Sequence, residues 1–324
     1  MPAHTSDSPP PRRDSGSPPG SPVKLPKGSW KGVLKRTVTE FKADNLIDWA
    51  AALTYYGVLS IFPALLALVS VLGLLGSDAI DPLIENVGTF APDSVQQLLT
   101  EMLGRLRENQ ATAGVALITG LAVALWSASG YVAGFMRASN AVYDIGEGRP
   151  VWKTLPIRVG VTLVLVVLLA ASAIAVVLTG TLARQVGDVI GLGETAVRVW
   201  DIAKWPVLVL LVAFMIGLLF RASPNARQSG MPWVSPGSLL AVLIWIIASA
   251  AFAFYVGNFG NYNQTYGSIA GVIIFLIWLW ISNIAILLGH KFNAELERAR
   301  AIATGHPPEE EPYVEPRDTR KLDD

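Results

Sequence analysis

The residues that most often carry catalysis are sparse in this sequence. Histidine occurs three times, as His4, His290 and His306, and cysteine does not occur. These residues do not cluster with carboxylates at metal-ligand spacing, so we expect neither a metal site nor a cofactor. The string Ser127 to Gly130 resembles a serine-protease motif, but small residues in an apolar stretch more often serve helix packing. We therefore expect no catalytic residues and no enzymatic activity.

A second set of residues could bind an anion. These charged residues lie near the ends of long apolar stretches, on the side that the orientation argument below places in the cytoplasm: Asp48, Arg137, Asp144, Arg221 and Glu295. They could anchor the helix ends and pair with one another. Alternatively, Arg137 and Arg221 could meet an anionic head group, because guanidinium groups suit phosphate. The sequence leaves both interpretations open.

A third set of polar residues lies within the apolar stretches. Tyr56, Ser60 and Pro63 fall close to one face of a helix, and the last stretch contains Ser282 and Asn283. Such residues either let helices pack closely or line a polar path. Pro63 also removes a backbone donor in the middle of a helix, which makes it a candidate hinge.

The elements that must position these residues are membrane helices. Of the 324 residues, 15% are charged and 52% are hydrophobic, whereas about a quarter of the residues in soluble domains are charged. An apolar run of about 20 residues crosses the hydrocarbon core. The sequence predicts an all-α fold with six such spans, at about 53–75, 113–136, 159–183, 205–220, 238–257 and 268–290. Arg158 then lies just before the third span, after the helix breakers Pro150 and Pro156.

The orientation follows from the distribution of positive charge. With six spans, 20 of the 25 Lys and Arg residues fall in segments on the same side as the two termini. The positive-inside rule therefore predicts that both termini are cytoplasmic. Residues 1–29 and 301–324 are rich in proline or in charge and are expected to be disordered tails on either side of a membrane domain at 30–300.

Two further segments have an amphipathic pattern. From Trp30 onward, apolar residues at helical spacing alternate with Lys and Arg, which predicts a basic helix on the membrane surface. Residues 77–110, in the first extracytoplasmic connection, repeat apolar residues at i, i+3, i+4 and i+7. We expect an amphipathic helix in that connection as well.

Five groups of residues occur along the chain in a distinctive order. They are Asp44 and Asp48 with Ala51–Tyr56 and Ser60–Pro63; Trp126–Gly130 with Asn140 and Tyr143; Phe220–Arg221 with Pro224; Pro236–Gly237 with Trp245; and Tyr266–Ser268 with Trp278, Leu288–Gly289 and Asn293–Glu295. Together these motifs resemble the YihY/BrkB family of bacterial inner-membrane proteins. The resemblance covers about residues 30–300, and the order of the motifs makes it specific.

The resemblance implies a six-helix protein of the bacterial cytoplasmic membrane. The family once carried the label ribonuclease BN, which is regarded as mistaken, and members are linked to serum resistance and to lipid or envelope transport. The net charge of zero and the lack of a basic, aromatic-lined groove also disfavour nucleic acid as a partner. We expect a transporter or permease whose partners are membrane lipids or an anionic lipid or solute. The alternative is a non-transporting membrane scaffold for envelope or virulence functions; the sequence does not indicate an oligomeric state.

Overall fold

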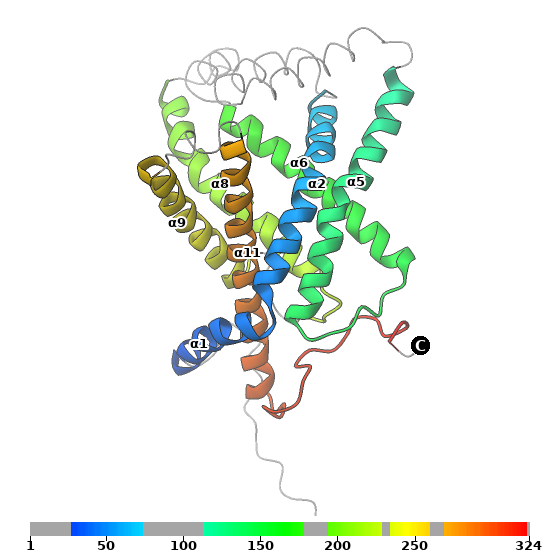
Figure 1. The fold of residues 1–324 in the computed structure, drawn as a ribbon, viewed down its shortest axis with the longest axis vertical. Coiled ribbons are helices and arrows are strands. Elements are labelled where there is room, and N and C mark those ends of the chain that lie inside the picture. Colours follow the sequence, from blue (N-terminus) through cyan, green and yellow to red (C-terminus); the bar gives the residue numbers. More distant parts are fainter. Residues whose placement is uncertain (1–26, 74–112, 178–193, 229–233, 260–268, 323–324) are drawn as a thin grey trace, which may run out of the picture.

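The computed structural model describes residues 27–73, 113–177, 194–228, 234–259 and 269–322. Within these ranges the chain forms helices and connecting segments and contains no β-strand (Figure 1), so the all-α class is confirmed for the described part. The helices are α1 (Lys27–Ala43), α2 (Leu46–Gly73), α5 (Ala113–Val142), α6 (Val151–Val177), α8 (Glu194–Ala222), α9 (Pro236–Phe259) and α11 (Ile269–Ala303).

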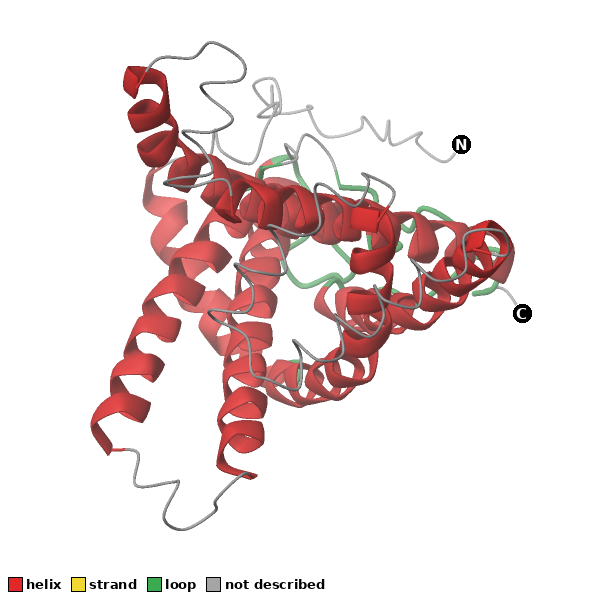
Figure 2. Cartoon of the chain, turned by 90° about the horizontal axis from the view of Figure 1, so that it is seen from above, coloured by secondary structure: helices red, strands yellow, loops and turns green. Residues whose placement is uncertain are grey.

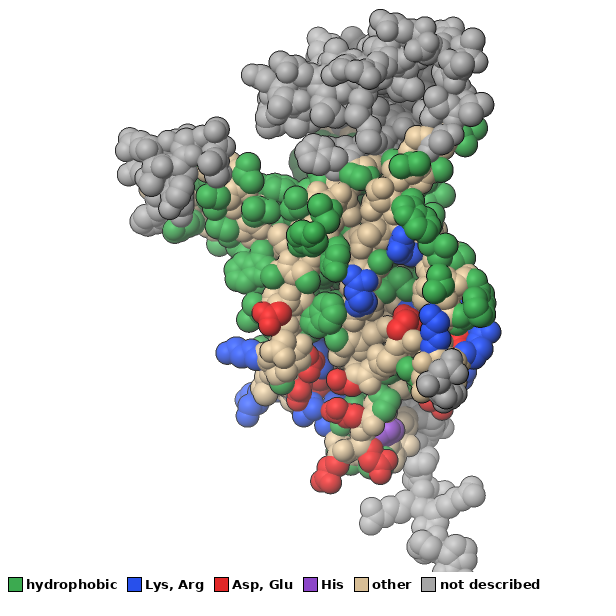
Figure 3. Space-filling model, turned by 45° about the vertical axis from the view of Figure 1, so that its right-hand side comes forward, with side chains coloured by type: hydrophobic (Ala, Val, Ile, Leu, Met, Phe, Trp, Pro, Cys, Tyr) green, Lys and Arg blue, Asp and Glu red, His purple; other side chains and the backbone are tan. Residues whose placement is uncertain are grey.

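Several helices are long and apolar enough to cross a membrane. Four satisfy both conditions over Val151–Val176, Ile202–Ala222, Pro236–Asn258 and Ala270–Ala303, and α2 adds a shorter apolar helix over Leu46–Ile61. Figure 3 shows hydrophobic side chains over much of the described surface, with most charged side chains gathered toward one end. We call this the polar end; it comprises α1, the start of α2, the end of α5 and the end of α11. An integral membrane protein has this distribution.

A sharp turn joins α1 to α2. Asn45, between the two helices, has a φ of 53°, a left-handed conformation that Asn tolerates better than most residues. The backbone N–H of Asp48 then donates to the carbonyl of Asn45 and starts α2. As a result α1 lies across the foot of the bundle while α2 runs up through it (Figure 1).

The longest described helix, α11, organises the bundle. It packs against α9, α2 and α1, and it runs near the middle of the view in Figure 1. The backbones of α9 and α11 touch at Gly237 and Gly289, where a Cβ on either glycine would overlap the carbonyl oxygen of the other. Between α2 and α5, a Cβ on Gly134 would lie 2.6 Å from the ring of Tyr56. Small residues therefore set both close approaches.

Packing is tight near the polar end and sparse farther along the helices. In α9, Ala241 and Val242 are at most 3% exposed, whereas Ile247 is 60% and Phe254 is 67% exposed. In α11, the residues from Ser282 to Glu297 are mostly buried and those just before them are not. The core therefore occupies the polar-end half of the described bundle.

Three helices extend farthest beyond the predicted spans. Helix α6 begins at Val151 and α8 at Glu194, while α11 continues to Ala303. Pro156 and Pro206 lie inside α6 and α8, because membrane helices tolerate proline where neighbouring groups satisfy the freed carbonyl. The extension of α6 places Arg158 inside a helix, about two turns from its start.

The predictions for the tails and the loop helix have different outcomes. The expected helix at 77–110 lies outside the described residues, as does most of the expected N-terminal tail. For the C-terminal tail the structure differs from the prediction, because Thr304 to Leu322 follow a defined path against the polar end (Figure 1). Contacts with distant loops, described below, hold this C-terminal segment in place.

Candidate functional site

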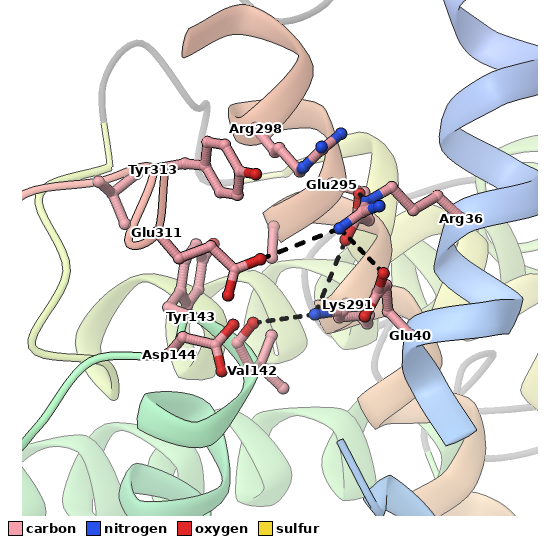
Figure 4. A pocket seen from close by; sticks show the side chains of 12 residues that line it. Arg36, Glu40, Val142, Tyr143, Asp144, Lys291, Glu295, Arg298, Glu311 and Tyr313 are labelled. Atoms are coloured by element: carbon pink, nitrogen blue, oxygen red, sulfur yellow. Dashed lines mark hydrogen bonds and ion pairs between the residues drawn. The ribbon is translucent and has the colours of Figure 1, made fainter. Parts of the chain in front are cut away.

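A small hollow lies at the polar end between α1, the residues after α5, and α11 (Figure 4). Lys291 of α11 joins its sides: its Nζ lies 2.6 Å from Oδ2 of Asp44 and 3.7 Å from Oε1 of Glu295. The same amine donates a 3.4 Å hydrogen bond to the carbonyl of Val142 at the end of α5. With a volume of about 20 Å³, the hollow has room for about one water molecule.

Arg36 of α1 closes the hollow from the other side. Its Nε lies 3.1 Å from Glu295, and its Nη2 lies 2.9 Å from Glu40 and 3.9 Å from Glu311 of the C-terminal segment. Figure 4 shows these carboxylates pointing toward the two cations from three separate elements. The hollow is thus a packed ion-pair network in which carboxylates predominate, and it is not suited to bind an anion.

Asp144 lies at the edge of this network with a strained backbone. It has a φ of 53° in the turn that follows α5, and it lines the hollow opposite Lys291. Burial raises the pKa of Asp144 above its ordinary value, and repulsion from Asp44, Glu311 and Glu40 adds to this effect while Lys291 opposes it. Ionisation of Asp144 is therefore less favourable than in water, even though Lys291 is nearby.

The structure separates the predicted cluster of charges. Asp144 and Glu295 share the hollow, but its described lining includes neither Arg137, Arg221 nor Asp48. Asp48 is exposed in the first turn of α2. The backbone carbonyl of Arg221 accepts a 2.6 Å hydrogen bond from Arg317 of the C-terminal segment, and the guanidinium of Arg137 lies 5.0 Å from the centre of the Tyr56 ring.

Arg158 is a charged residue that sequence reasoning placed outside the membrane. Its Nε donates a 2.8 Å hydrogen bond to Oγ of Ser129, and its guanidinium carbon lies 4.9 Å from the centre of the Trp126 ring. Both partners are in α5, so Arg158 points along the bundle away from the polar end. Sequence reasoning missed this position of Arg158 because it treated Pro156 as a helix breaker, whereas α6 continues through Pro156.

The residues of the predicted polar path face different neighbours. Asn283 is fully buried; its Nδ2 donates to Oγ1 of Thr54 over 3.1 Å, and its Oδ1 accepts from the Tyr131 hydroxyl over 2.8 Å. It therefore joins α11 to α2 and α5. The adjacent Ser282 instead accepts a 3.0 Å hydrogen bond from Nε1 of Trp245 on α9 and donates to the carbonyl of Trp278.

The α2 members of the predicted path lie at the contact with α5. Tyr56 fills the space beside Gly134, and Oγ of Ser60 lies 3.7 Å from where a Cβ on Gly130 would stand. Pro63 is inside α2, which continues beyond it to Gly73. These positions fit close packing of α2 on α5. Pro63 lacks a backbone N–H inside the helix and so stays a candidate hinge.

His290 occupies an aromatic box at the base of the core. Its ring is fully buried, with the ring centre 4.4 Å from that of Phe220, 5.5 Å from Tyr143 and 5.7 Å from Phe135. Neither ring nitrogen hydrogen-bonds to a described residue. The imidazole here packs as an aromatic ring that joins α11 to α5 and α8. Among the described residues, no group of His, Cys, Asp or Glu could hold a metal ion.

Sequence reasoning missed the network that holds the C-terminal segment. Asn225 lies at its centre: the side-chain amide donates over 2.8 Å to the carbonyl of Asp318 and accepts over 3.1 Å from the N–H of Asp318. The backbone N–H of Asn225 donates to Oδ1 of Asn140. Hydrogen bonds from Arg320 and Lys153 hold the pKa of Asp318 well below its ordinary value. No local pattern signals these contacts, because they join residues 85 and 93 positions apart.

The sequence comparisons now decide the family. The family model for the virulence factor BrkB matches residues 37–313. The chain belongs to the BrkB family. The matched range includes the Arg158 site and most residues of the ion-pair hollow, although Arg36 lies one position before it. It ends within the C-terminal segment and includes Asn225 but not Asp318.

Individual relatives agree with this assignment. The chain is 31% identical over 280 residues to YfkH of Bacillus subtilis, whose name calls it ribonuclease-like; the match covers 86% of this chain and 98% of YfkH. It is 29% identical to a UPF0761 membrane protein of Alkalilimnicola ehrlichii and 28% identical to one of Xanthomonas axonopodis. These matches cover 82% and 84% of this chain but 59% and 65% of those proteins, so the chain spans less than two thirds of them. No solved structure matches.

Proposed function

We propose that this BrkB-family protein is a permease of the bacterial cytoplasmic membrane that moves a lipid or another envelope component. In this proposal six helices cross the membrane, both termini are cytoplasmic, and the protein is not an enzyme. Its partners are membrane lipids and an anionic lipid or solute. Nothing among the described residues supports the ribonuclease activity that the name of YfkH suggests.

The observation that carries the proposal is the uneven packing of the bundle. Ion pairs and buried side chains close the polar-end half, whereas the far half of α9 leaves large apolar residues uncovered, including Ile247 and Phe254. A permease that is closed at one face and accessible to lipid at the other has this distribution. A simple anchor needs no such difference along its helices.

The charge distribution supports the proposed orientation. Both α1 and the C-terminal segment lie at the polar end (Figure 1). Arg36 belongs to α1, Lys291 to the end of α11 and Arg317 to the C-terminal segment. Basic residues concentrate in the cytoplasmic segments of membrane proteins. The polar end therefore corresponds to the cytoplasmic face in this proposal, and the hollow lies on that side.

A non-transporting scaffold is the alternative. The uncovered half of α9 could then be the contact surface of another membrane protein instead of a lipid-facing surface. The two functions differ in one measurable respect, because a scaffold moves nothing across a bilayer.

The test is transport by the purified protein in proteoliposomes. Fluorescent phospholipids of several head groups would be followed from one leaflet to the other with a membrane-impermeant quencher, together with flux of a panel of small anions. We expect one class to move several-fold faster than in protein-free vesicles. Rates equal to those of protein-free vesicles for the whole panel would exclude the permease and favour the scaffold.

A further inference from the structure

We propose that Arg137 and Arg158 together bind the phosphate group of an anionic phospholipid in the cytoplasmic leaflet. The proposal deepens the permease function and rests on its orientation, because it names the lipid class and the residues that would hold it. Nothing in the family assignment identifies these two residues as a site.

Arg158 has several N–H donors that no described residue accepts. A guanidinium carries five N–H groups, and in Arg158 only Nε has an acceptor among the described residues, the hydroxyl of Ser129. Neither Arg158 nor Arg137 forms an ion pair with a described carboxylate, in contrast to Arg36, Arg149 and Lys291. The fork of Arg158 is thus held at one nitrogen and open at the other two.

Position makes this unpaired charge costly. Arg158 lies inside α6 within a stretch apolar enough to span a membrane, and it reaches toward Ser129 and Trp126 and not toward the polar end. Charged side chains at this depth are expensive and are usually paired with an opposite charge. Trp126, the ring under Arg158, and Arg137 lie on nearly the same face of α5, and an anion that contacts both guanidinium groups would neutralise the two charges.

The surroundings favour a lipid over a soluble anion. Arg137 is exposed on α5, and the exposed residues Trp126 and Val123 form an apolar stripe on nearly the same helix face, 11 and 14 positions earlier in the chain. Figure 3, which brings the side of α5 and α6 forward, shows basic side chains among hydrophobic ones above most of the charged groups. A phosphate held here would have its acyl chains against this apolar stripe, whereas a free phosphate would leave the stripe uncovered.

The ring contacts fit the same assignment. The guanidinium of Arg158 lies over Trp126 and that of Arg137 lies over Tyr56, so each fork has one face on an aromatic ring and its edge available for hydrogen bonds. Guanidinium groups bind phosphate through this edge, often with two parallel bonds. The two rings therefore hold the guanidinium groups in place and leave their edge N–H groups available to an anion.

The proposal can be tested by measuring lipid binding separately from transport. The purified protein in neutral detergent would be titrated with phosphatidylglycerol or phosphatidylcholine, and bound lipid counted by native mass spectrometry. We expect preference for phosphatidylglycerol, reduced about tenfold in Arg158→Gln and in Arg137→Gln, with partial recovery in Arg158→Lys. The matched control is Lys321→Gln, which removes the same charge from an exposed side chain outside the helices and should leave the preference unchanged.

A structural role for Arg158 would give a different result. If the arginine only stabilised the fold, Arg158→Gln would lower the melting temperature without changing the ratio of the two lipid affinities. Because Arg158→Gln removes an unpaired charge from an apolar site, we expect the melting temperature without lipid to stay the same or rise. Equal affinity for both lipids in the wild-type protein, or a preference that survives both glutamine variants, would overturn the proposal.

A second titration distinguishes the source of the phosphate. Inorganic phosphate and glycerol phosphate would be tested for stabilisation of the protein against heating. Stabilisation that Arg137→Gln and Arg158→Gln abolish, without preference for phosphatidylglycerol, would assign the site to a soluble anion and overturn the lipid. Binding that passes these tests in a protein that moves no lipid in proteoliposomes would leave the site intact and reject only the permease.

Discussion

Nζ of Lys291 lies 2.6 Å from Oδ2 of Asp44, and this ion pair joins the end of α11 to the turn between α1 and α2. The side chains of Lys291 and Glu295 are 5% and 4% exposed, and that of Asp44 is 14% exposed. A pair this deeply buried adds to the apolar contact between α1 and α11, where Val33 packs against Phe292 and Leu296. Its partners cannot be solvated if one charge is removed, so it governs the stability of the polar end.

Lys291→Met should therefore be strongly destabilising. The variant leaves Asp44 and Glu295 buried near each other without their shared cation, and we expect a loss of about 3 kcal/mol or more. Thermal unfolding in detergent measures the loss. The control is Arg227→Gln, which breaks an ion pair with Glu315 in which both side chains are exposed, and it should cost less than about 1 kcal/mol. Equal losses in the two variants would contradict the role assigned to Lys291.

Asp144→Asn should change how stability depends on pH. Since the folded-state pKa of Asp144 is raised above the ordinary value, the folded protein binds more protons than the unfolded chain just above pH 4, and stability falls as pH rises through this window. Asn cannot titrate and tolerates the φ of 53° at this position. We expect the variant to be more stable at pH 7 by less than about 1 kcal/mol, because Asp144 is partly exposed.

The measurement is the unfolding temperature of both proteins between pH 4 and 8. The difference between them should shrink toward the acid end, where Asp144 in the folded wild-type protein becomes protonated. A constant difference over the whole range would show that the substitution acts through the backbone or through Lys291 and not through the titration of Asp144.

Gly148→Ala should release the C-terminal segment. A Cβ at Gly148 would overlap the carbonyl oxygen of Asp318, so the segment must move away from Asn225. We expect a loss of about 1–3 kcal/mol and faster proteolysis between Thr304 and Leu322. In Gly160→Ala, the control, the added Cβ meets nothing within 4 Å, and the α6 helix should be unchanged or slightly more stable. Identical cleavage rates in both variants would contradict the close contact at Gly148.

The sequence predicted the parts of the fold that depend on local pattern. Uncharged runs located the helices, and the alternation from Trp30 onward predicted α1, whose Val33 and Phe41 are buried as that spacing requires. The ends of the helices were less predictable, because a helix in a membrane protein continues through Pro156 when neighbours compensate for the missing hydrogen bond. That single misinterpretation hid the position of Arg158.

Long-range polar contacts were not predictable at all. The composition of residues 301–324 suggested disorder, yet Asn225 replaces the hydrogen-bond partners that this segment would otherwise find in water. Similarly, the five charged residues predicted to cluster do not all lie together, because the depth of a side chain depends on the rotation and tilt of its helix. Asp144 and Glu295 share a hollow, while Arg137 lies over Tyr56.

Pro63→Ala should show whether the proline of α2 is a hinge. Pro63 cannot donate a hydrogen bond to the carbonyl of Leu59, and α2 nevertheless continues beyond it. Alanine restores the donor, so we expect normal insertion and an equal or higher unfolding temperature. If bending at Pro63 is part of transport, the rate in proteoliposomes should fall several-fold in the same variant. Pro206→Ala in α8 is the control, because it restores a donor in another helix interior. Greater stability combined with slower transport in Pro63→Ala alone indicates a hinge, since a purely structural proline has no reason to affect the two in opposite directions; unchanged transport would assign Pro63 to packing.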